Sequence, residues 1–438
     1  MERSSNLLRA KAYQRLEIPE SLEPMTRAIS CDFKSRKAIV GAKVTMEQLA
    51  DALLPQGWMP PVVPEFKGIT VGGAIAGAAI ESSSGLYGQF NDRCMAYKIW
   101  NGREVIEASR EKNSDLFYGV SGAYGALGSI LEAEIELIPA PGFMELFYES
   151  FSKLDVAIEA MARSEVPVEG LVFSEHRIVL VYAKPIDKAS AGKLPRLYLS
   201  STCSEWFYSH VDAVVKDKNS YVESIAIKDY LFRHDRGAFW MAGYGLYLPV
   251  LANYLLHKWG CPSHSLLPHV KPKNPGFLYR ALFGWFLDSQ SLYKSLHKGG
   301  ESFFERKVVV QDFYIPKTAA LKWIKYVLNN YQITPLWICP VFSTDKPQIF
   351  SPHRTKKKEL MFDVGVYGIP FGCSASDVVK DLEGKTVEVG GKKMLYSQNY
   401  YPIEGFWEIY SKKEYDVLRA RYADDSSIAD ITRKVLKL

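Results

Sequence analysis

Hydrophobic and polar positions alternate most clearly over residues 130–138, where apolar side chains exchange with glutamates. This two-residue period predicts a strand with one buried face. Residues 38–44 predict an earlier strand. Thr45 then provides the N-cap of a helix with one apolar face, which Pro55 and Gly57 end. The first part of the chain is therefore expected to combine antiparallel strands with helices.

Two turn signals divide this pattern further. The dipeptide Asn101-Gly102 separates two apolar runs within 95–108, which predicts a hairpin closed by a tight type I′ turn. Two prolines and a glycine within 139–142 end the last strand and predict a linker. We therefore expect two domains, residues 1–141 and residues 142–438.

The second part mixes helical and strand periods, which indicates an α+β fold. It is richer in aromatic residues than the first part and has no internal repeat. The expected helices cover 152–165, a segment opened by Pro316, and 412–423; the expected strands cover 308–315, 336–342 and 361–369.

Composition narrows the classes of function. The 438 residues are 47% hydrophobic, which excludes a disordered or fibrous protein, and the net charge of +5 without a long basic run argues against nucleic acid as a partner. The six cysteines lie far apart, so neither a disulfide framework nor a metal site is expected.

One uncharged segment, 237–256, has the length of a membrane span, but its glycines, Pro249 and Asn253 favour a buried or interfacial segment. The N-terminus leads into no apolar run of the kind found in a secretory signal. The surrounding aromatic stretch, 232–286, is interpreted as core, with a surface facing a lipid or a membrane as the alternative.

A segment rich in small residues, 60–88, contains the first candidate binding loop. Its glycines let the backbone approach a ligand closely, and unpaired N–H groups there would bind an anion such as a pyrophosphate. A tightly packed turn is the alternative. The spacing matches neither the dinucleotide-binding G-x-G-x-x-G nor a P-loop. The candidate binding residues are Thr70, Val71, Gly72, Gly73, Ala74, Gly77, Glu81, Ser82, Ser83, Ser84 and Gly88.

A second glycine cluster, 119–128, runs directly into the alternating strand. It adds Gly122, Gly125, Gly128 and Ile130 as candidate binding residues. Two glycine-rich segments separated by a hairpin suggest one elongated ligand bound at two places.

Together these segments resemble the flavin-binding domain of the vanillyl-alcohol-oxidase superfamily, also called the PCMH-type FAD-binding domain. More narrowly, the chain is similar to the sterol Δ24-reductase family (Diminuto/Dwarf, 24-dehydrocholesterol reductase) over roughly residues 37–410. The segments that carry the similarity include Thr70-Val71-Gly72-Gly73, Glu81-Ser82-Ser83-Ser84, Asn113-Ser114-Asp115-Leu116-Phe117-Tyr118, Pro335-Leu336-Trp337, Asp363-Val364-Gly365-Val366-Tyr367 and Phe406-Trp407-Glu408.

The resemblance implies an α+β FAD-binding domain followed by an α+β substrate or cap domain. Family members carry a membrane anchor and a first glycine-rich loop before the strand at 38–44, whereas residues 1–37 contain no glycine. We therefore expect an N-terminally shortened flavin domain and non-covalent FAD, with NADPH as the electron source. The expected location is the endoplasmic reticulum membrane, by peripheral contact, or the cytoplasm if the missing anchor is genuine. The oligomeric state is left open.

Reduction of an isolated C=C bond needs a hydride on one carbon and a proton on the other. In the superfamily the second domain covers the reactive edge of the flavin, so the resemblance implies an acid from the later segments. Packed tyrosines, an ion-paired Asp363 and a solvated charged run around His234 are the alternative readings. The candidates are Tyr400, Tyr401, Asp363, Tyr367 and, in a charged run, His234.

The leading interpretation is an FAD-dependent oxidoreductase that reduces the Δ24 side-chain double bond of a sterol. Two alternatives stay open. One is another flavin oxidoreductase of the superfamily, acting on an alcohol, a lactone or a different lipid. The other is a non-catalytic homologue that binds a sterol or a protein partner.

Overall fold

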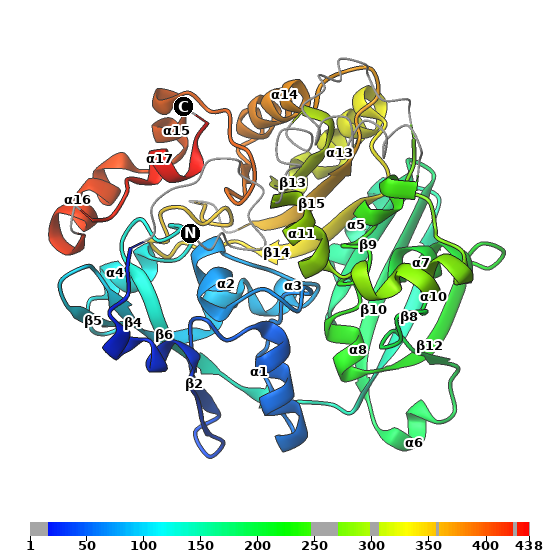
Figure 1. Ribbon diagram of the computed structural model, residues 1–438. Coiled ribbons are helices and arrows are strands. Elements are labelled where there is room, and N and C mark those ends of the chain that lie inside the picture. The colour runs from blue at the N-terminus through cyan, green and yellow to red at the C-terminus, as the bar shows by residue number, and fades with distance from the viewer. Residues whose placement is uncertain (1–15, 247–269, 298–305, 356–358, 424–426, 438) are drawn as a thin grey trace.

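The computed structural model describes residues 16–246, 270–297, 306–355, 359–423 and 427–437 (Figure 1). Two β-sheets organise these residues. The first sheet has five strands in the order β1-β2-β6-β4-β5, all antiparallel. Its strands are β1 (Ile29–Asp32), β2 (Lys37–Gly41), β4 (Cys94–Trp100), β5 (Val105–Ser109) and β6 (Ser129–Glu136).

The predicted elements of this part are confirmed. In β6 the apolar residues are buried and the glutamates are partly exposed, as the alternation predicted. Helix α1 (Met46–Leu53) begins at Thr45, whose side chain accepts from the N–H of Gln48, and Gly57 adopts the left-handed conformation after Leu54–Gln56. Around this sheet lie α2 (Val71–Gly77), α3 (Ser84–Tyr87), α4 (Ser114–Gly119), the short strands β3 (Trp58–Met59) and β7 (Ile138–Pro139), and the 3-10 turns Glu20–Leu22, Pro24–Arg27 and Phe90–Arg93.

The predicted hairpin is present, but its turn is longer than a two-residue type I′ turn. Trp100 pairs with Val105, so four residues form the loop. The reason is the side chain of Asn101, whose Oδ1 accepts from the N–H groups of Arg103 and Glu104, both at 2.9 Å. The Asn side chain therefore closes the turn in place of a tight backbone reversal.

The second sheet has nine strands in the order β11-β12-β8-β10-β9-β14-β15-β13-β16, and only the pair β11–β12 is parallel. All the helices and strands predicted for this part are confirmed. The strands are β8 (Phe143–Phe151), β9 (Val168–Ser174), β10 (Arg177–Ile186), β11 (Arg196–Leu197), β12 (Ser220–Ala226), β13 (Val309–Pro316), β14 (Leu336–Phe342), β15 (Leu360–Gly368) and β16 (Lys392–Lys393).

Helices cover one face of this sheet (Figure 1), namely α5 (Leu154–Ala162), α13 (Lys317–Tyr331) and α14 (Ala375–Glu388). In β15, Phe362, Val364 and Val366 pack into that apolar layer. The intervening positions point to the opposite face, which looks towards the first part of the chain. This opposite face carries the polar residues described below.

The remaining helices lie at the edges and at the C-terminus. Helices α16 and α17 return to the first part of the chain, where Arg419 Nη1 donates to the carbonyl of Ala126 and Tyr422 donates to Asp115 (Figure 1). The remaining elements are α6 (Lys188–Ala191), α7 (Phe207–Val214), α8 (Ile227–Leu231), the 3-10 turns Met241–Leu246 and Gly284–Phe286, α10 (Phe277–Phe283), α11 (Ser289–His297), α15 (Ile403–Ile409), α16 (Lys412–Tyr422) and α17 (Ile431–Val435).

The uncharged segment 237–256 is described only as far as residue 246, and residues 247–256 lie outside the described part. In the described part, Trp240 and Tyr244 are buried and pack in the core. No helix among the described residues has the length and apolar character that crossing a membrane requires.

Candidate functional site

The first glycine segment forms the start of helix α2, not an open loop. The N–H groups of Val71 and Gly72 donate to the carbonyls of Val44 and Ala42, both at 2.9 Å. The N–H of Gly73 donates to Thr70 Oγ1 at 3.1 Å. The expected nest of unpaired N–H groups is therefore wrong for these residues. The glycine is needed for packing, since a Cβ on Gly72 would lie 2.8 Å from the Cβ of Ala42.

The second glycine segment packs against the end of this helix. The N–H of Gly122 donates to the carbonyl of Ile75 at 3.2 Å, and the N–H of Tyr124 donates to the carbonyl of Ala76 at 3.1 Å. Gly122 has a φ of +72°, and a Cβ there would lie 3.0 Å from the carbonyl oxygen of Phe350. The structure thus brings the two glycine segments together. Of the other candidate binding residues, Ala74 is buried in α2, Gly77 faces Tyr124, Gly125 and Gly128 have positive φ, and Ile130 is buried in β6.

The serine run turns its hydroxyls towards the protein. Ser82 donates to Glu81 at 2.8 Å, and Ser83 donates to the carbonyl of Pro61 at 2.7 Å. Ser84 Oγ accepts from the N–H of Glu81 at 3.1 Å. These hydroxyls therefore fix the position of the Glu81 loop. Gly88, with a φ of +77°, ends α3.

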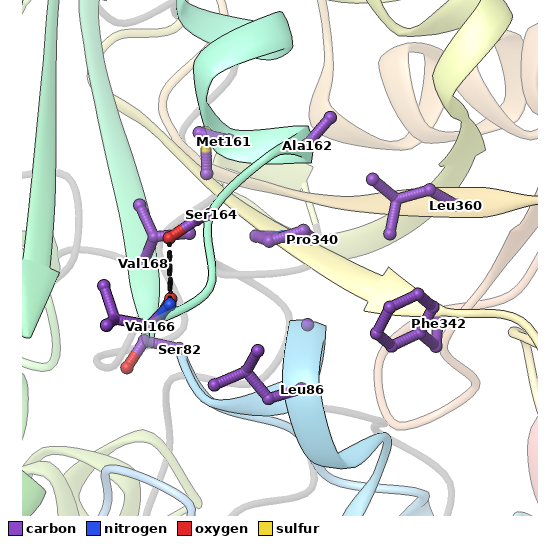
Figure 2. Close-up of a pocket in the computed structure, with 11 residues that line it drawn as sticks. Ser82, Leu86, Met161, Ala162, Ser164, Val166, Val168, Pro340, Phe342 and Leu360 are labelled. Atoms are coloured by element: carbon purple, nitrogen blue, oxygen red, sulfur yellow. Dashed lines mark hydrogen bonds between the residues drawn. The ribbon is translucent and has the colours of Figure 1, made fainter.

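A cavity of about 30 Å³ lies where α3 meets β14. Figure 2 shows Ser82 and Leu86 on one side of it and Pro340 and Phe342 on the other. Its volume is about that of one water molecule in the liquid, so it marks the seam between the two parts and is too small for a flavin ring.

A buried ionic cluster connects the second sheet to the segment after α8. Arg233 Nε donates to Glu169 Oε1 at 2.6 Å, and His234 Nε2 donates to Glu169 Oε2 at 2.7 Å. Trp337 Nε1 adds a third bond to this carboxylate at 2.6 Å. The alternative reading of the charged run around His234 as a solvated face is wrong, because Arg233 and His234 are buried against Glu169. Asp235 is also buried, and it accepts from Ser289 and from the N–H of Lys67.

The ionisable residues of this cluster shift each other's pKa values. Burial acts to raise the pKa of Glu169, but Arg233 and His234 outweigh it and hold that pKa well below its usual range. Burial lowers the pKa of His234, so its ring is neutral and donates through Nε2. His234 Nδ1 is left buried without a hydrogen-bond partner among the described residues.

Two further carboxylates lie near Arg233. Burial raises the pKa of Glu65 well above its usual range, although Arg233 opposes the shift. Burial raises the pKa of Glu81 in the same way. Glu65 Oε1 lies 3.8 Å from Arg233 Nη2, and neither atom has a hydrogen-bond partner within the described part of the chain. A donor and an acceptor are thus left buried and unused at this point.

Asp363 is the most unusual candidate. It lies on the polar face of the second sheet, paired across the sheet with Tyr314 on β13 and with Cys339 on β14. It is fully buried, and neither carboxylate oxygen has a hydrogen bond or an ion pair with any described residue. Burial, together with Asp312 and Glu65, raises its pKa well above the usual range. The alternative of a salt bridge to a core arginine or lysine is therefore not met among the described residues, and burial favours the protonated form of Asp363.

Tyr367 lies four residues further along β15 on the same face and donates a hydrogen bond to Asp312. Burial raises the pKa of Asp312 to about 6, although Tyr367 and Tyr396 oppose the shift by hydrogen bonding. Gly365 makes room for this arrangement, since a Cβ there would lie 2.6 Å from the Tyr367 ring. Asp363 and Tyr367 are thus brought together, with Asp312 as a partner.

Of the other two tyrosine candidates, Tyr400 lies apart from this group. Tyr400 packs against the apolar layer on the helix-covered side of the sheet, and its hydroxyl is buried without a hydrogen-bond partner among the described residues. Tyr401 is a core residue, with Lys393 5.9 Å from its ring centroid. The structure therefore separates Tyr400 from Asp363.

Sequence reasoning missed several members of the site. A hydrogen-bonded chain joins the two parts: Gln89 Nε2 donates to Tyr314 at 3.2 Å, Ser351 donates to Gln89 at 2.6 Å, and His353 lies 2.7 Å from Ser351 and 3.0 Å from Asp92. Glu169 and Asp312 were also missed. Both stand in mostly apolar strands, the kind of signal that singled out Asp363.

Comparison with known proteins shows which proteins this chain is similar to. The profile of the FAD binding domain matches residues 4–108. The Delta(24)-sterol reductases of Homo sapiens and Mus musculus are each 29% identical over 419 residues, which cover 93% of this chain and 76% of the relative. The enzyme of Arabidopsis thaliana is 27% identical over 421 residues, 86% of this chain and 69% of the relative.

The chain is similar to the Delta(24)-sterol reductases over most of its length. The relationship covers both sheets, so the polar face of the second sheet lies within the region shared with these reductases. As in the resemblance stated for the sequence, an FAD-binding domain forms the first part of the homologous region.

The residues present fit a flavin ring better than they fit its pyrophosphate. The unused polar atoms of Glu65, Arg233 and Asp363 are buried where the two parts meet, and a flavin ring offers both carbonyl acceptors and an N–H donor. Near the glycine segments, by contrast, the N–H groups of Val71, Gly72 and Gly73 already have protein partners. Arg233 and Glu65 are therefore the residues suited to hold the polar edge of the ring.

Proposed function

We propose that the chain is an FAD-dependent reductase of the Δ24 side-chain double bond of sterols, with NADPH as the electron source. The observation that carries the proposal is the similarity to Delta(24)-sterol reductases over 93% of the chain. The buried polar face of the second sheet supports it, because a reductase of an isolated double bond needs a proton donor in apolar surroundings.

In this proposal the protein supplies the proton and the surroundings. FAD bound here and reduced by NADPH would supply the hydride that the double bond accepts. Asp363 is held neutral by burial and by its acidic neighbours, so it carries the proton that the other carbon takes up. Tyr367 and Asp312 lie beside it on the same face and fix its surroundings. The second sheet acts as the cap over the substrate, and the protein works at the surface of the endoplasmic reticulum membrane.

One observation favours a second candidate, a sterol-binding homologue without flavin chemistry. The N–H groups at the start of α2 are paired within the protein and are not free for a pyrophosphate. This candidate binds sterol but retains no FAD.

The absorption spectrum of the purified chain, taken before and after addition of FAD and removal of the excess, tests both. The reductase retains a flavin spectrum that NADPH bleaches without oxygen and that a Δ24-unsaturated sterol restores. An oxidase of the superfamily is instead reoxidised rapidly by oxygen. A chain that retains no flavin contradicts the reductase and supports the binding homologue.

A further inference from the structure

Helix α10 and the 3-10 turn that follows it expose an unusual set of apolar side chains. Leu278 is 75% exposed and Trp285 is 69% exposed. Exposed apolar side chains scattered singly are ordinary, but a contiguous group marks an interaction site. The exposed large apolar residues of this segment are Phe277, Leu278, Leu282, Phe283, Trp285 and Phe286, called here the α10 patch.

The helix faces the protein with Arg280 and with Tyr279, which packs against the core. Arg280 Nε donates to the carbonyl of Cys203 at 2.9 Å, and Gly284 is buried so closely that a Cβ would lie 2.1 Å from the carbonyl oxygen of Thr202. Arg236 Nη1 fixes the same point by donating to the carbonyl of Gly284 at 3.0 Å. A surface helix of a globular protein normally buries its apolar side, so this orientation is the reverse of the usual one.

The helical spacing makes the exposed side continuous. Phe277, Leu278, Ala281 and Leu282 recur at three- and four-residue steps and are all exposed. Figure 1 shows α10 on the outer side of the second part, near α7. The patch therefore faces outwards as one stripe.

The charged residues close to the patch in the sequence indicate which kind of partner it binds. Between residues 270 and 297 the chain carries Lys271, Lys273, Arg280 and Lys294 against a single acidic residue, Asp288. Apolar and aromatic side chains flanked by lysines are the pattern of a segment that lies in the interface of an anionic bilayer. A protein partner would be expected to bury a patch rimmed by charges of both signs.

We propose that the α10 patch is a membrane-docking surface that inserts its apolar side chains into the interface of a bilayer containing anionic lipid. The surface is inferred from exposure and charge alone. Under the proposed function it would also bring the site to a substrate dissolved in the membrane.

Flotation of the full chain with vesicles of phosphatidylcholine and phosphatidylserine tests the docking. We expect the wild type to float with the vesicles and the double variant L278S/L282S to lose at least about tenfold of its partitioning, because two buried leucines contribute most of the insertion energy of so short a helix. The variant K271E/K273E should lose binding to the anionic vesicles and bind pure phosphatidylcholine as weakly as the wild type does.

Val417→Ser is the matched control, since Val417 is 59% exposed on α16 and lies outside the patch. The melting temperature of each variant shows that it is folded. Wild-type protein that stays with the soluble fraction, or patch variants that float like the wild type, would overturn the proposal. So would a patch-dependent dimer in light scattering, which would make a second copy the occupant. Sterol reduction in detergent is measured separately, so a failed docking does not count against the proposed activity.

Discussion

The residue that bears most on the chemistry is Asp363, a buried acid without a counter-ion among the described residues. Burying an ionised carboxylate is costly, so the folded protein keeps Asp363 protonated. A proton held in this way is available to a substrate, and it also makes the stability of the protein depend on pH.

For Asp363→Asn we expect turnover to fall by about 10²-fold or more, because general acid catalysis contributes on that order. The melting temperature of the variant, by contrast, should be higher than that of the wild type, and the reason is the raised pKa of Asp363. The folded-state pKa of Asp363 is raised, so the wild type loses stability as the pH rises above the ordinary value of 3.8, and the variant does not. The variant should therefore melt higher than the wild type at pH 8 and equally at pH 4.

Tyr400→Phe is the control for this experiment, since Tyr400 lies on the helix-covered side of the sheet. Its turnover should stay near that of the wild type. Full turnover in Asp363→Asn would assign the proton to another group, and lost turnover in Tyr400→Phe would show that the sheet does not separate the two residues functionally.

Asp312 gives a second pH dependence at a defined range. Its pKa is raised from 3.8 to about 6, so its contribution to stability is complete below pH 3.8 and is lost as the pH rises through 6. The unfolding free energy of the wild type should fall between pH 4 and pH 8 as Asp312 ionises. At 1.36 kcal/mol for each pKa unit, we expect this fall to be smaller by roughly 3 kcal/mol in Asp312→Asn. Urea unfolding at the two pH values measures this difference. The same fall in unfolding free energy in the variant and in the wild type would contradict the prediction.

At the scale of an element, the two-residue period of strand β15 places its apolar side chains on one face of the sheet and its polar side chains on the other. Phe362, Val364 and Val366 pack under the helices, while Asp363, Gly365 and Tyr367 form the polar face. The glycine in this series has no side chain to pack, and its absence of a Cβ is what allows the Tyr367 ring to lie along the strand towards Asp312.

Gly365→Ala should therefore lower the unfolding free energy by about 1–3 kcal/mol, because the added Cβ overlaps the Tyr367 ring. It should also lower turnover, since Tyr367 must move away from Asp312. Gly384→Ala is the matched control: Gly384 is an exposed residue of α14 with open space around the added Cβ, and the change should stabilise the protein by about 0.5–1 kcal/mol. Denaturant unfolding of both variants distinguishes the steric overlap at Gly365 from the general effect of replacing a glycine by alanine.

Elements governed by local rules could be predicted from the sequence. The cap at Thr45 and the alternation in β6 depend on residues a few positions apart, and both are as predicted. The burial of Arg233 and His234 depends on Glu169, 64 and 65 residues away, and the charged run by itself pointed to solvent. Likewise, Asp363 was found by its unusual place in an apolar strand, but its neighbours on β13 and β14 are set by strand pairing that no local pattern contains.

At the scale of the whole molecule, helices α16 and α17 fix the position of the second glycine segment, which belongs to the first part of the chain. Lys434 on α17 is buried and donates to the carbonyl of Gly125 at 2.7 Å and to that of Tyr124 at 3.4 Å. Arg419 on α16 donates to the neighbouring carbonyl of Ala126 at 3.0 Å. The second glycine segment is thus fixed by residues from the far end of the sequence.

Lys434→Met should loosen this segment, because the carbonyls of Tyr124 and Gly125 lose a buried charged donor. We expect a loss of about 1–3 kcal/mol in unfolding free energy and a lower ratio of retained flavin to protein. Arg433→Met, at the exposed neighbouring position, should change neither quantity. Unchanged flavin retention in Lys434→Met would mean that the segment holds its conformation without α17.

The attachment of α17 also has a consequence for how the protein is made. Tyr124 and Lys434 are 310 residues apart, so the glycine segment leaves the ribosome long before the helix that fixes it. The first sheet can begin to form during synthesis, but the second glycine segment is fixed only after α17 has also been made. FAD is therefore expected to be retained only by a chain in which α17 has packed against this segment.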